Sequence, residues 1–469
     1  MPISAFSDKK YLVVMTKDGG EDNYATLISR QPDHVSASCA ARPSLAFTQE
    51  ELNGPYASVR LSGSQFSLHP ALQPLVSIWD AGEMAITHRV GTMFTDLANV
   101  PIDEVRRATN VSYTGSVLMP FGISAHDRQA FSSVSMITRD YTDSSGRARV
   151  VAESGMLGRL AERFEGFAGS SSLPMSILCG LVDASGTLLT SDGMTRGLTI
   201  PTAGFTFRRN LTGAPTQEAA LRRLDAVMAE LRSERRTEAF RRVNLVANAG
   251  VAFLQPVIEG GVGTFTVDQS FPGDIVGGWR GILRTYARVI EADVRRPTLQ
   301  NRVILIGSMS GYDTHAAQGK MTGRLPGLHA DWATGVACFR DAMIRLGVWN
   351  NTLMLDHSEF GRSLRENGAN GGTDHGYARD AFAFGGAVRG KGRDGSTGLF
   401  GQYPSVLSAS GNGTFDLIGG LAGGGALAPG ISMEQYWDEP LRWFGADAAD
   451  IADALPRRSA FGASVNLIA

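Results

Sequence analysis

The chain has 469 residues, with 44 Lys and Arg against 46 Asp and Glu and a formal net charge of −2. This balance argues against a protein that binds nucleic acid through bulk positive charge, because such a protein needs a basic face to displace counterions. With 43% hydrophobic and 19% charged residues, the chain can bury a large core and is not a disordered polyelectrolyte. No apolar run in the sequence is long enough to span a membrane.

The first elements along the chain predict an α/β protein. Residues 11–15 are uniformly apolar and run into a Gly-rich turn, which is typical of a strand covered on both faces. Apolar residues at helical spacing over 68–79 predict a helix, and residues 84–90 predict a second strand. A strand, a helix and a strand in this order indicate the start of a parallel sheet.

The middle of the chain, residues 155–300, is predicted to be a helix-rich insertion. Residues 216–242 are rich in Ala, Leu, Glu and Arg with helical periodicity, and residues 278–293 form a second helix candidate. We expect this insertion to cap the sheet and not to fold around a core of its own.

Strands return after Pro297. The apolar runs 302–308, 351–355 and 381–385 predict three more strands, and the amphipathic stretch 328–346 predicts a helix between the first two. We expect four of the predicted strands to be neighbouring and mostly parallel members of one sheet: 11–15, 302–307, 351–356 and 381–385.

Metal-capable side chains gather where these strands end. They form four groups: Asp18 with Asp22; Asp313 with His315; Asp356, His357 and Glu359 with Arg362; and Asp374 with His375. Sites in open α/β sheets lie outside the carboxyl ends of the strands, so the groups can converge on one crevice. Mixed oxygen and nitrogen ligands favour zinc or manganese. Two such ions about 4 Å apart would suit hydrolysis of a phosphate or sulfate ester.

Each group also has an ordinary structural interpretation, which the sequence leaves open. These interpretations are a turn for Asp18, a helix cap for Asp313, strand-end exposure for Asp356 and His357, an ion pair for Glu359 and Arg362, and a loop hydrogen bond for Asp374 and His375. Four other histidines have no such neighbours and are interpreted as structural: His34, His69, His88 and His329.

Three of these segments resemble the motifs of a bacterial family called domain of unknown function 1501. Residues 311–318, Gly-Tyr-Asp-Thr-His-Ala-Ala-Gln, resemble its G-x-D-T-H-x-x-Q signature. Residues 358–363 resemble S-[ED]-F-G-R-T, and residues 372–376 resemble G-x-D-H-G. Weaker matches cover nearly the whole chain, at 19–22, 66–72, 155–159, 385–390 and 399–404.

That family is similar in fold to the alkaline phosphatase and sulfatase superfamily. The resemblance implies a single α/β domain over residues 1–469, with a large, mostly parallel central sheet between helical layers and a helical insertion at 155–300. It also implies a hydrolytic site with one or two metal ions. The residues carried over as ligands are Asp18 or Asp22, Asp313, His315, Glu359 and His375, and Arg362 is carried over as a donor to a bound oxyanion. Asp374, which directly precedes His375, is a further candidate ligand.

The sequence departs from the family at the element that would supply a nucleophile. Residues 123–129 resemble a family element in which Ser directly precedes His126, but Ala125 stands there. Ser124 is one residue away and is the catalytic candidate, because a Ser or Thr near a metal is the attacking group in the superfamily. His126, Asp356 and His357 are further candidates for the site. The family usually carries a twin-arginine export leader and the sequence shows none, so the residues favour the cytoplasm and the resemblance favours export.

The sequence therefore predicts a metal-dependent hydrolase-like protein that acts on a small phosphate or sulfate ester. The divalent ion would be zinc, manganese or calcium, and the partner would be a small anionic substrate. The alternative is a non-catalytic binding or structural protein that retains the fold, which Ala125 favours. The metal-capable residues should share one crevice, and His375 is the ligand on which the site prediction depends most.

Overall fold

The computed structural model describes most of the chain outside its middle third. The described residues are 8–97, 100–108, 139–142, 148–151, 155–165, 263–273, 277–295, 302–368, 371–405, 417–418 and 424–469, with single residues at 117, 120, 125, 126, 133, 257 and 260. The predicted helix at 216–242 and the catalytic candidate Ser124 lie outside them.

A seven-stranded sheet forms the centre of the molecule. Its order is β12-β4-β11-β8-β1-β7, and β15 also pairs with β4. The strands are β1 (Lys10–Asp18), β4 (Met84–Gly91), β7 (Arg302–Ser310), β8 (Thr352–His357), β11 (Arg379–Gly385), β12 (Leu399–Phe400) and β15 (Ile431–Ser432).

The sheet is mostly parallel. β1 lies between β7 and β8 and is parallel to both, with Val13 opposite Leu305 and Met354. β12 and β15 are parallel to β4, whereas β11 is antiparallel to β4 and to β8. The predicted strands are therefore neighbours in one mostly parallel sheet, and only the direction of β11 differs from the rest.

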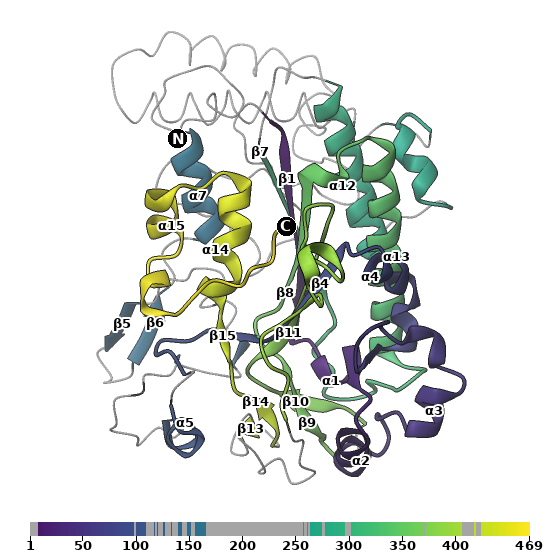
Figure 1. Ribbon diagram of the computed structural model, residues 1–469, viewed down its shortest axis with the longest axis vertical. Helices are drawn as coiled ribbons and strands as arrows, with labels where there is room; N and C mark the ends of the chain where they lie inside the picture. The colour runs from purple at the N-terminus through teal and green to yellow at the C-terminus, as the bar shows by residue number, and fades with distance from the viewer. Residues whose placement is uncertain are drawn as a thin grey trace, which may run out of the picture.

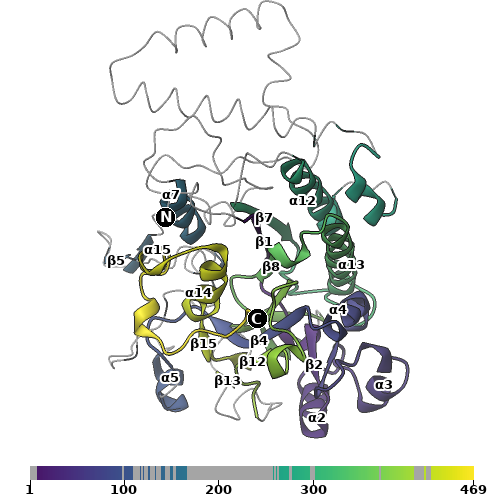
Figure 2. The ribbon, with the colours of Figure 1, turned by 45° about the horizontal axis from the view of Figure 1, so that its top comes forward.

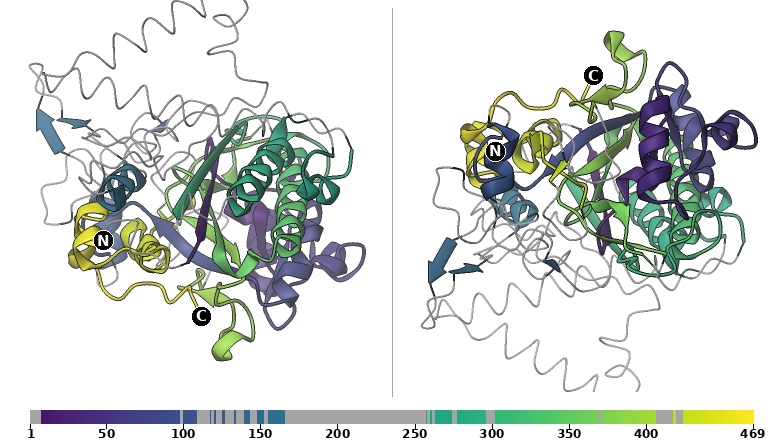
Figure 3. Two further views of the ribbon diagram at one scale, coloured as in Figure 1. Left: turned by 90° about the horizontal axis from the view of Figure 1, so that it is seen from above. Right: turned by 90° about the horizontal axis from the view of Figure 1, so that it is seen from below.

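Helices cover both faces of this sheet (Figures 1 and 3). Val13 and Met15 face the core under α12 (Gly278–Val294) and α13 (Arg324–Arg345). Leu12 and Val14 face the core under α7 (Met156–Glu165), α14 (Met433–Phe444) and α15 (Ala448–Ala454). Because side chains alternate along a strand, both faces of β1 need apolar residues, which explains its continuous apolar run. The α/β class with a central sheet between helical layers is confirmed.

The predicted helix at 68–79 is shorter than expected. Residues Pro70–Leu75 form a 3-10 helix, and only Val76–Asp80 form an α-helix, α4. Pro70 and Pro74 lack the backbone N–H that an α-helix needs, so the α-helix begins only after them. Helix α14 was not predicted from the sequence; it begins at a capping box of Ser432 and Gln435.

The described parts of the predicted insertion pack on the sheet. Helix α7 covers one face and α12 the other (Figure 2). The division of the chain into one domain with an insertion at 155–300 stays a prediction. None of the described helices combines the length and the apolar composition needed to cross a bilayer.

Small elements surround the central sheet. The hairpin of β9 (Arg362–Glu366) and β10 (Thr373–His375) follows β8 and carries part of the candidate site. The other described helices and strands are α1 (Asn23–Thr26), β2 (Leu27–Ser29), α2 (Pro32–Ala41), α3 (Gln49–Asn53), β3 (Phe66–Leu68), α5 (Ile102–Ala108), β5 (Arg139–Thr142), β6 (Ala148–Val151), β13 (Leu417–Ile418) and β14 (Ala426–Leu427).

Candidate metal centre

Two close backbone approaches bring the strand-end loops together. Gly19, directly after β1, has φ +119°, and a Cβ at this position would lie 2.1 Å from Asp313 N. A Cβ on Gly372 would lie 2.3 Å from the carbonyl carbon of His315. Only glycine fits at such distances. The loop after β7 is therefore held between the turn after β1 and the β9–β10 hairpin.

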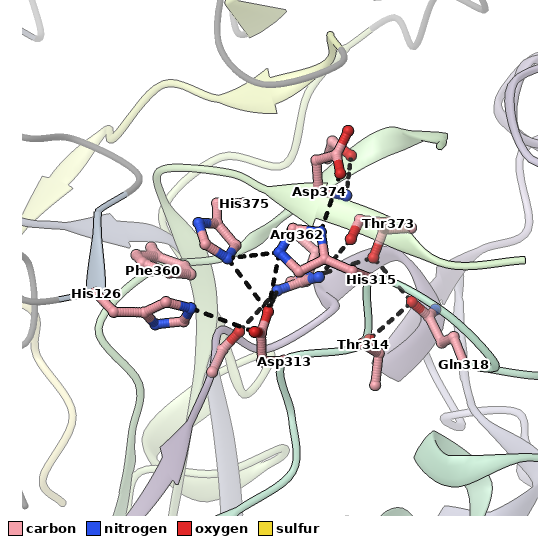
Figure 4. Close-up of polar contacts among 12 residues, drawn as sticks. His126, Asp313, Thr314, His315, Gln318, Phe360, Arg362, Thr373, Asp374 and His375 are labelled. Carbon is pink, nitrogen blue, oxygen red and sulfur yellow. Dashed lines mark hydrogen bonds and ion pairs between the residues drawn. The ribbon is translucent and has the colours of Figure 1, made fainter. Parts of the chain in front are cut away.

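Three imidazole rings meet one carboxylate at this junction (Figure 4). Asp313 Oδ1 lies 3.1 Å from His315 Nε2 and 3.2 Å from His375 Nε2. The two Nε2 atoms of His315 and His375 lie 2.8 Å apart. His126 Nε2 lies 3.6 Å from the other oxygen of Asp313, Oδ2. Four ligand-type side chains from three separate segments thus share one small volume.

Two further carboxylates orient two of these rings. Glu359 Oε1 lies 2.9 Å from His126 Nδ1, and Asp374 Oδ1 lies 3.0 Å from His315 Nδ1. An ionised carboxylate only accepts hydrogen bonds, so in the neutral ring it favours the proton on Nδ1, and Nε2 then carries the lone pair. The hydrogen bond that His126 donates to Glu359 is the main cause that raises the pKa of His126. Glu359 is fixed in turn by Gly19 N, which donates to Oε1 at 2.9 Å.

Arg362 is fully buried behind Asp313. Its Nη1 donates to Asp313 Oδ1 and to Gly19 O, both at 2.8 Å, and Nη2 and Nε donate to the carbonyl and the hydroxyl of Thr373. Burial raises the pKa of Asp313, but the hydrogen bond and charge of Arg362 outweigh burial and hold that pKa below its usual range. Arg362 therefore directs its donors at groups of the protein, and it keeps Asp313 ionised.

Asp22 lies in a buried network under the site. Its carboxylate caps α1, accepts from Arg42 Nη1 at 2.9 Å and 3.1 Å, and accepts from Gln318 Nε2 at 2.6 Å. Gln318 Oε1 accepts from the hydroxyls of Thr314 and Thr373 at 2.9 Å and 2.8 Å. The motif at 311–318 thus has a physical explanation: its Asp and His enter the cluster, and its Thr and Gln anchor the loop from below.

The other candidates are engaged elsewhere. The Ser308 hydroxyl donates to Asp18 Oδ2. Asp356 is fully buried and accepts from Lys17 Nζ at 3.0 Å and from Arg379 Nη1 at 3.0 Å. His357 is buried, its Nε2 lies 3.1 Å from Ser133 Oγ, and burial lowers its pKa to about 3.

Sequence reasoning gave His126 only a secondary place and gave Phe360 no role. The Phe360 ring lies 4.7 Å from the ring of His375 and 5.0 Å from that of His126, measured between centroids, so it forms an apolar wall behind both. The motif at 358–363 contains Phe360, and this was the one signal available. His126 is joined to Glu359 across 233 positions of sequence, which no local pattern reveals.

The cluster fits a bound divalent ion. The ligand-type atoms of His126, Asp313 and His375 lie within 4.8 Å of one another. With bonds of about 2.0–2.2 Å, neighbouring ligand atoms of a tetrahedral site lie roughly 3.3 Å apart, close to the distances found here. His126 Nε2 is buried and has no hydrogen-bond partner within the described part of the chain. A metal ion would supply the missing partner of that lone pair.

Comparison with known proteins confirms the family resemblance. The family described as "Protein of unknown function (DUF1501)" matches residues 285–409, and this stretch holds the motifs at 311–318, 358–363 and 372–376. No curated protein matches the chain.

Solved structures add little beyond this match. They include the phosphonoacetate hydrolase of Sinorhizobium meliloti 1021 in complex with phosphonoformate, at 10% identity and a TM-score of 0.29, covering 76% of this chain and 57% of that chain. They also include the lipoteichoic acid synthase LtaP of Listeria monocytogenes, at 8% identity and a TM-score of 0.28, covering 85% of this chain and 67% of that chain. This chain thus spans little more than half the length of the phosphonoacetate hydrolase.

Proposed function

Starting from the match of residues 285–409 to the DUF1501 family, we propose that this chain is a metal-dependent hydrolase of small phosphate or sulfate esters. The proposed ligands are His126, Asp313, His315 and His375. The observation that carries the proposal is the approach of three imidazole Nε2 atoms to the single carboxylate of Asp313.

The donor set favours zinc or manganese as the ion. Imidazole nitrogen with one carboxylate suits these metals, whereas calcium takes oxygen ligands almost throughout. In this proposal Glu359 and Asp374 act through His126 and His315 and do not bind the ion themselves. Such carboxylate partners of ligating histidines orient the ring and increase its basicity.

When bound, a divalent ion at this position would polarise the ester oxygen and lower the pKa of a water molecule. The chain's own residues hold the site open and charged for this purpose. The side chains of Asp313, His315 and His126 are 43%, 44% and 40% exposed, so an anionic substrate can reach them. Arg362 keeps Asp313 ionised from behind, and Phe360 excludes water from the rear of two rings.

The attacking group is either a water molecule or Ser124. Two nearby hydroxyls are directed inward: Ser358 Oγ donates to Lys17 O at 2.9 Å, and Thr373 Oγ1 donates to Gln318 Oε1 at 2.8 Å. Neither is free to attack a substrate in this arrangement. The Ser124→Ala variant separates the two routes, because it abolishes turnover only if the serine hydroxyl attacks.

The test combines metal analysis with turnover. The protein is purified without chelator, its metal content is measured, and hydrolysis of p-nitrophenyl phosphate and p-nitrophenyl sulfate is followed. We expect bound zinc or manganese, and we expect His375→Ala to remove the ion and the activity together. The matched control is His34→Gln, a histidine whose Nδ1 bonds Ser29 outside the cluster. Protein without metal and without hydrolysis would contradict the proposal, and bound metal without any turnover would favour the non-catalytic alternative that Ala125 suggests.

A further inference from the structure

Three carboxylates at the same sheet edge lie outside the histidine cluster and are almost completely buried. Glu21, Asp22 and Asp356 are 0%, 1% and 0% exposed. Carboxylates of this kind, at the ends of β1 and β8, are groups that could ligate a second metal ion.

Each of the three is paired with a buried cation of the protein itself. Lys17 Nζ lies 2.6 Å from Glu21 Oε1 and 3.0 Å from Asp356 Oδ2. Arg379 Nη1 lies 3.0 Å from Asp356 Oδ1 and 3.5 Å from Glu21 Oε2. Arg42 completes the set by binding both oxygens of Asp22.

These cations are permanent parts of the interior. Lys17 and Arg379 are 0% and 1% exposed as side chains, and Arg42 is 1% exposed. The Lys17 ammonium also lies 3.4 Å from the centroid of the Trp332 ring, a cation–π contact that desolvation strengthens. Three buried cations therefore face three buried carboxylates, of which Glu21 has its pKa raised by burial to about 8. A divalent ion could enter only by displacing a cation into an apolar interior, which is strongly unfavourable.

We infer that the described part of this sheet edge holds one metal ion, and that Lys17, Arg42 and Arg379 exclude a second ion from Glu21, Asp22 and Asp356 by occupying these buried carboxylates. The count of one rests on the proposed function, because the histidine cluster supplies the site of that ion. The exclusion of a second ion rests on the buried charge pairs alone. Lys17 is the decisive residue because its single ammonium bridges two carboxylates.

The experiment replaces the ammonium and counts ions. Metal-free protein is dialysed against Mn²⁺, and bound manganese is measured for the wild type, for Lys17→Met and for the control Lys17→Met/Glu21→Gln. Methionine is one heavy atom shorter than lysine and carries no charge, and the second change removes the carboxyl group with which Lys17 pairs most closely. We expect one equivalent in the wild type, two in Lys17→Met and one in the double variant. Mn²⁺ should also raise the melting temperature of Lys17→Met more than that of the wild type.

Two results would overturn the inference: two equivalents in the wild type, or equal numbers in Lys17→Met and the double variant. If Lys17→Met does not fold without metal, refolding with and without Mn²⁺ gives the answer, since recovery only with Mn²⁺ supports the inference and no recovery contradicts it. Failure of the proposed function has a different signature. The wild type would then bind no ion, while Lys17→Met would still bind one more than the double variant.

Discussion

Replacing Gln318 by Leu tests whether the network under the loop holds the metal ligands in place. Gln318 is fully buried and bridges Asp22 to Thr314 and Thr373. Leucine has a similar volume but can make none of these hydrogen bonds. The change leaves the shape of the interior intact and removes only its polar contacts.

The expected loss follows from counting those contacts. The bond to the Asp22 carboxylate is charge-assisted and contributes about 1.5–3 kcal/mol, and the two hydroxyl bonds contribute about 0.5–1.5 kcal/mol each. Leucine recovers a part of this through its own apolar burial. We therefore expect the free energy of unfolding of the metal-free protein to fall by about 2–4 kcal/mol.

The assay is urea-induced unfolding in the presence of a chelator, followed by titration of the refolded variant with Zn²⁺. Because the loop carries Asp313 and His315, its loosening should also weaken metal affinity by about 10–100-fold, as is typical when groups behind the ligands are lost. The control is Gln402→Leu, an exposed glutamine whose replacement should change stability by less than about 0.5 kcal/mol. A loss below about 1 kcal/mol with unchanged metal affinity would refute this account of the motif.

Two further predictions concern buried charge. Arg362→Met should lower the free energy of unfolding of the metal-free protein by about 2–4 kcal/mol, because a buried ion pair is broken while Asp313 keeps partial access to water. The control is Arg365→Met, at an exposed arginine of β9. Equal effects of the two changes in urea unfolding would count against the role given to Arg362. Stability should also fall as the pH is lowered from about 6.5 to 4. Burial lowers the pKa of His69 to about 4 and that of His357 to about 3 in the folded protein. The unfolded chain therefore binds more protons than the folded chain in this pH range. His69 Nδ1 accepts a hydrogen bond from Ala71 N, which requires the neutral ring. The contribution of His69 to stability, about 3 kcal/mol, is completely lost once the pH is below 4. His69→Gln should flatten the pH dependence of the unfolding free energy, and an unchanged slope would show that His69 does not cause it.

The sequence determined those features that depend on local pattern. The apolar runs at 11–15, 302–308 and 351–355 predicted β1, β7 and β8, because a strand covered on both faces needs apolar side chains at every position. The polar residues after these strands predicted where a site would lie, because parallel strands end at a common edge. Asp313, His315 and His375, which the structure brings together, were named as candidates from this reasoning and from the family motifs.

Tertiary structure decided what depends on contacts between distant segments. An apolar run carries no information on strand direction, so only packing showed that β11 runs antiparallel to β8. Asp22 and Asp356 have the same chemistry as Asp313, and no local pattern separates the three. Asp22 and Asp356 are enclosed with Arg42 and Lys17 in the interior. Asp313 also pairs with a buried cation, Arg362, but its side chain is 43% exposed. It faces three imidazoles that come from three different parts of the chain. The role of each carboxylate is therefore set by its exposure and by the side chains that folding places around it.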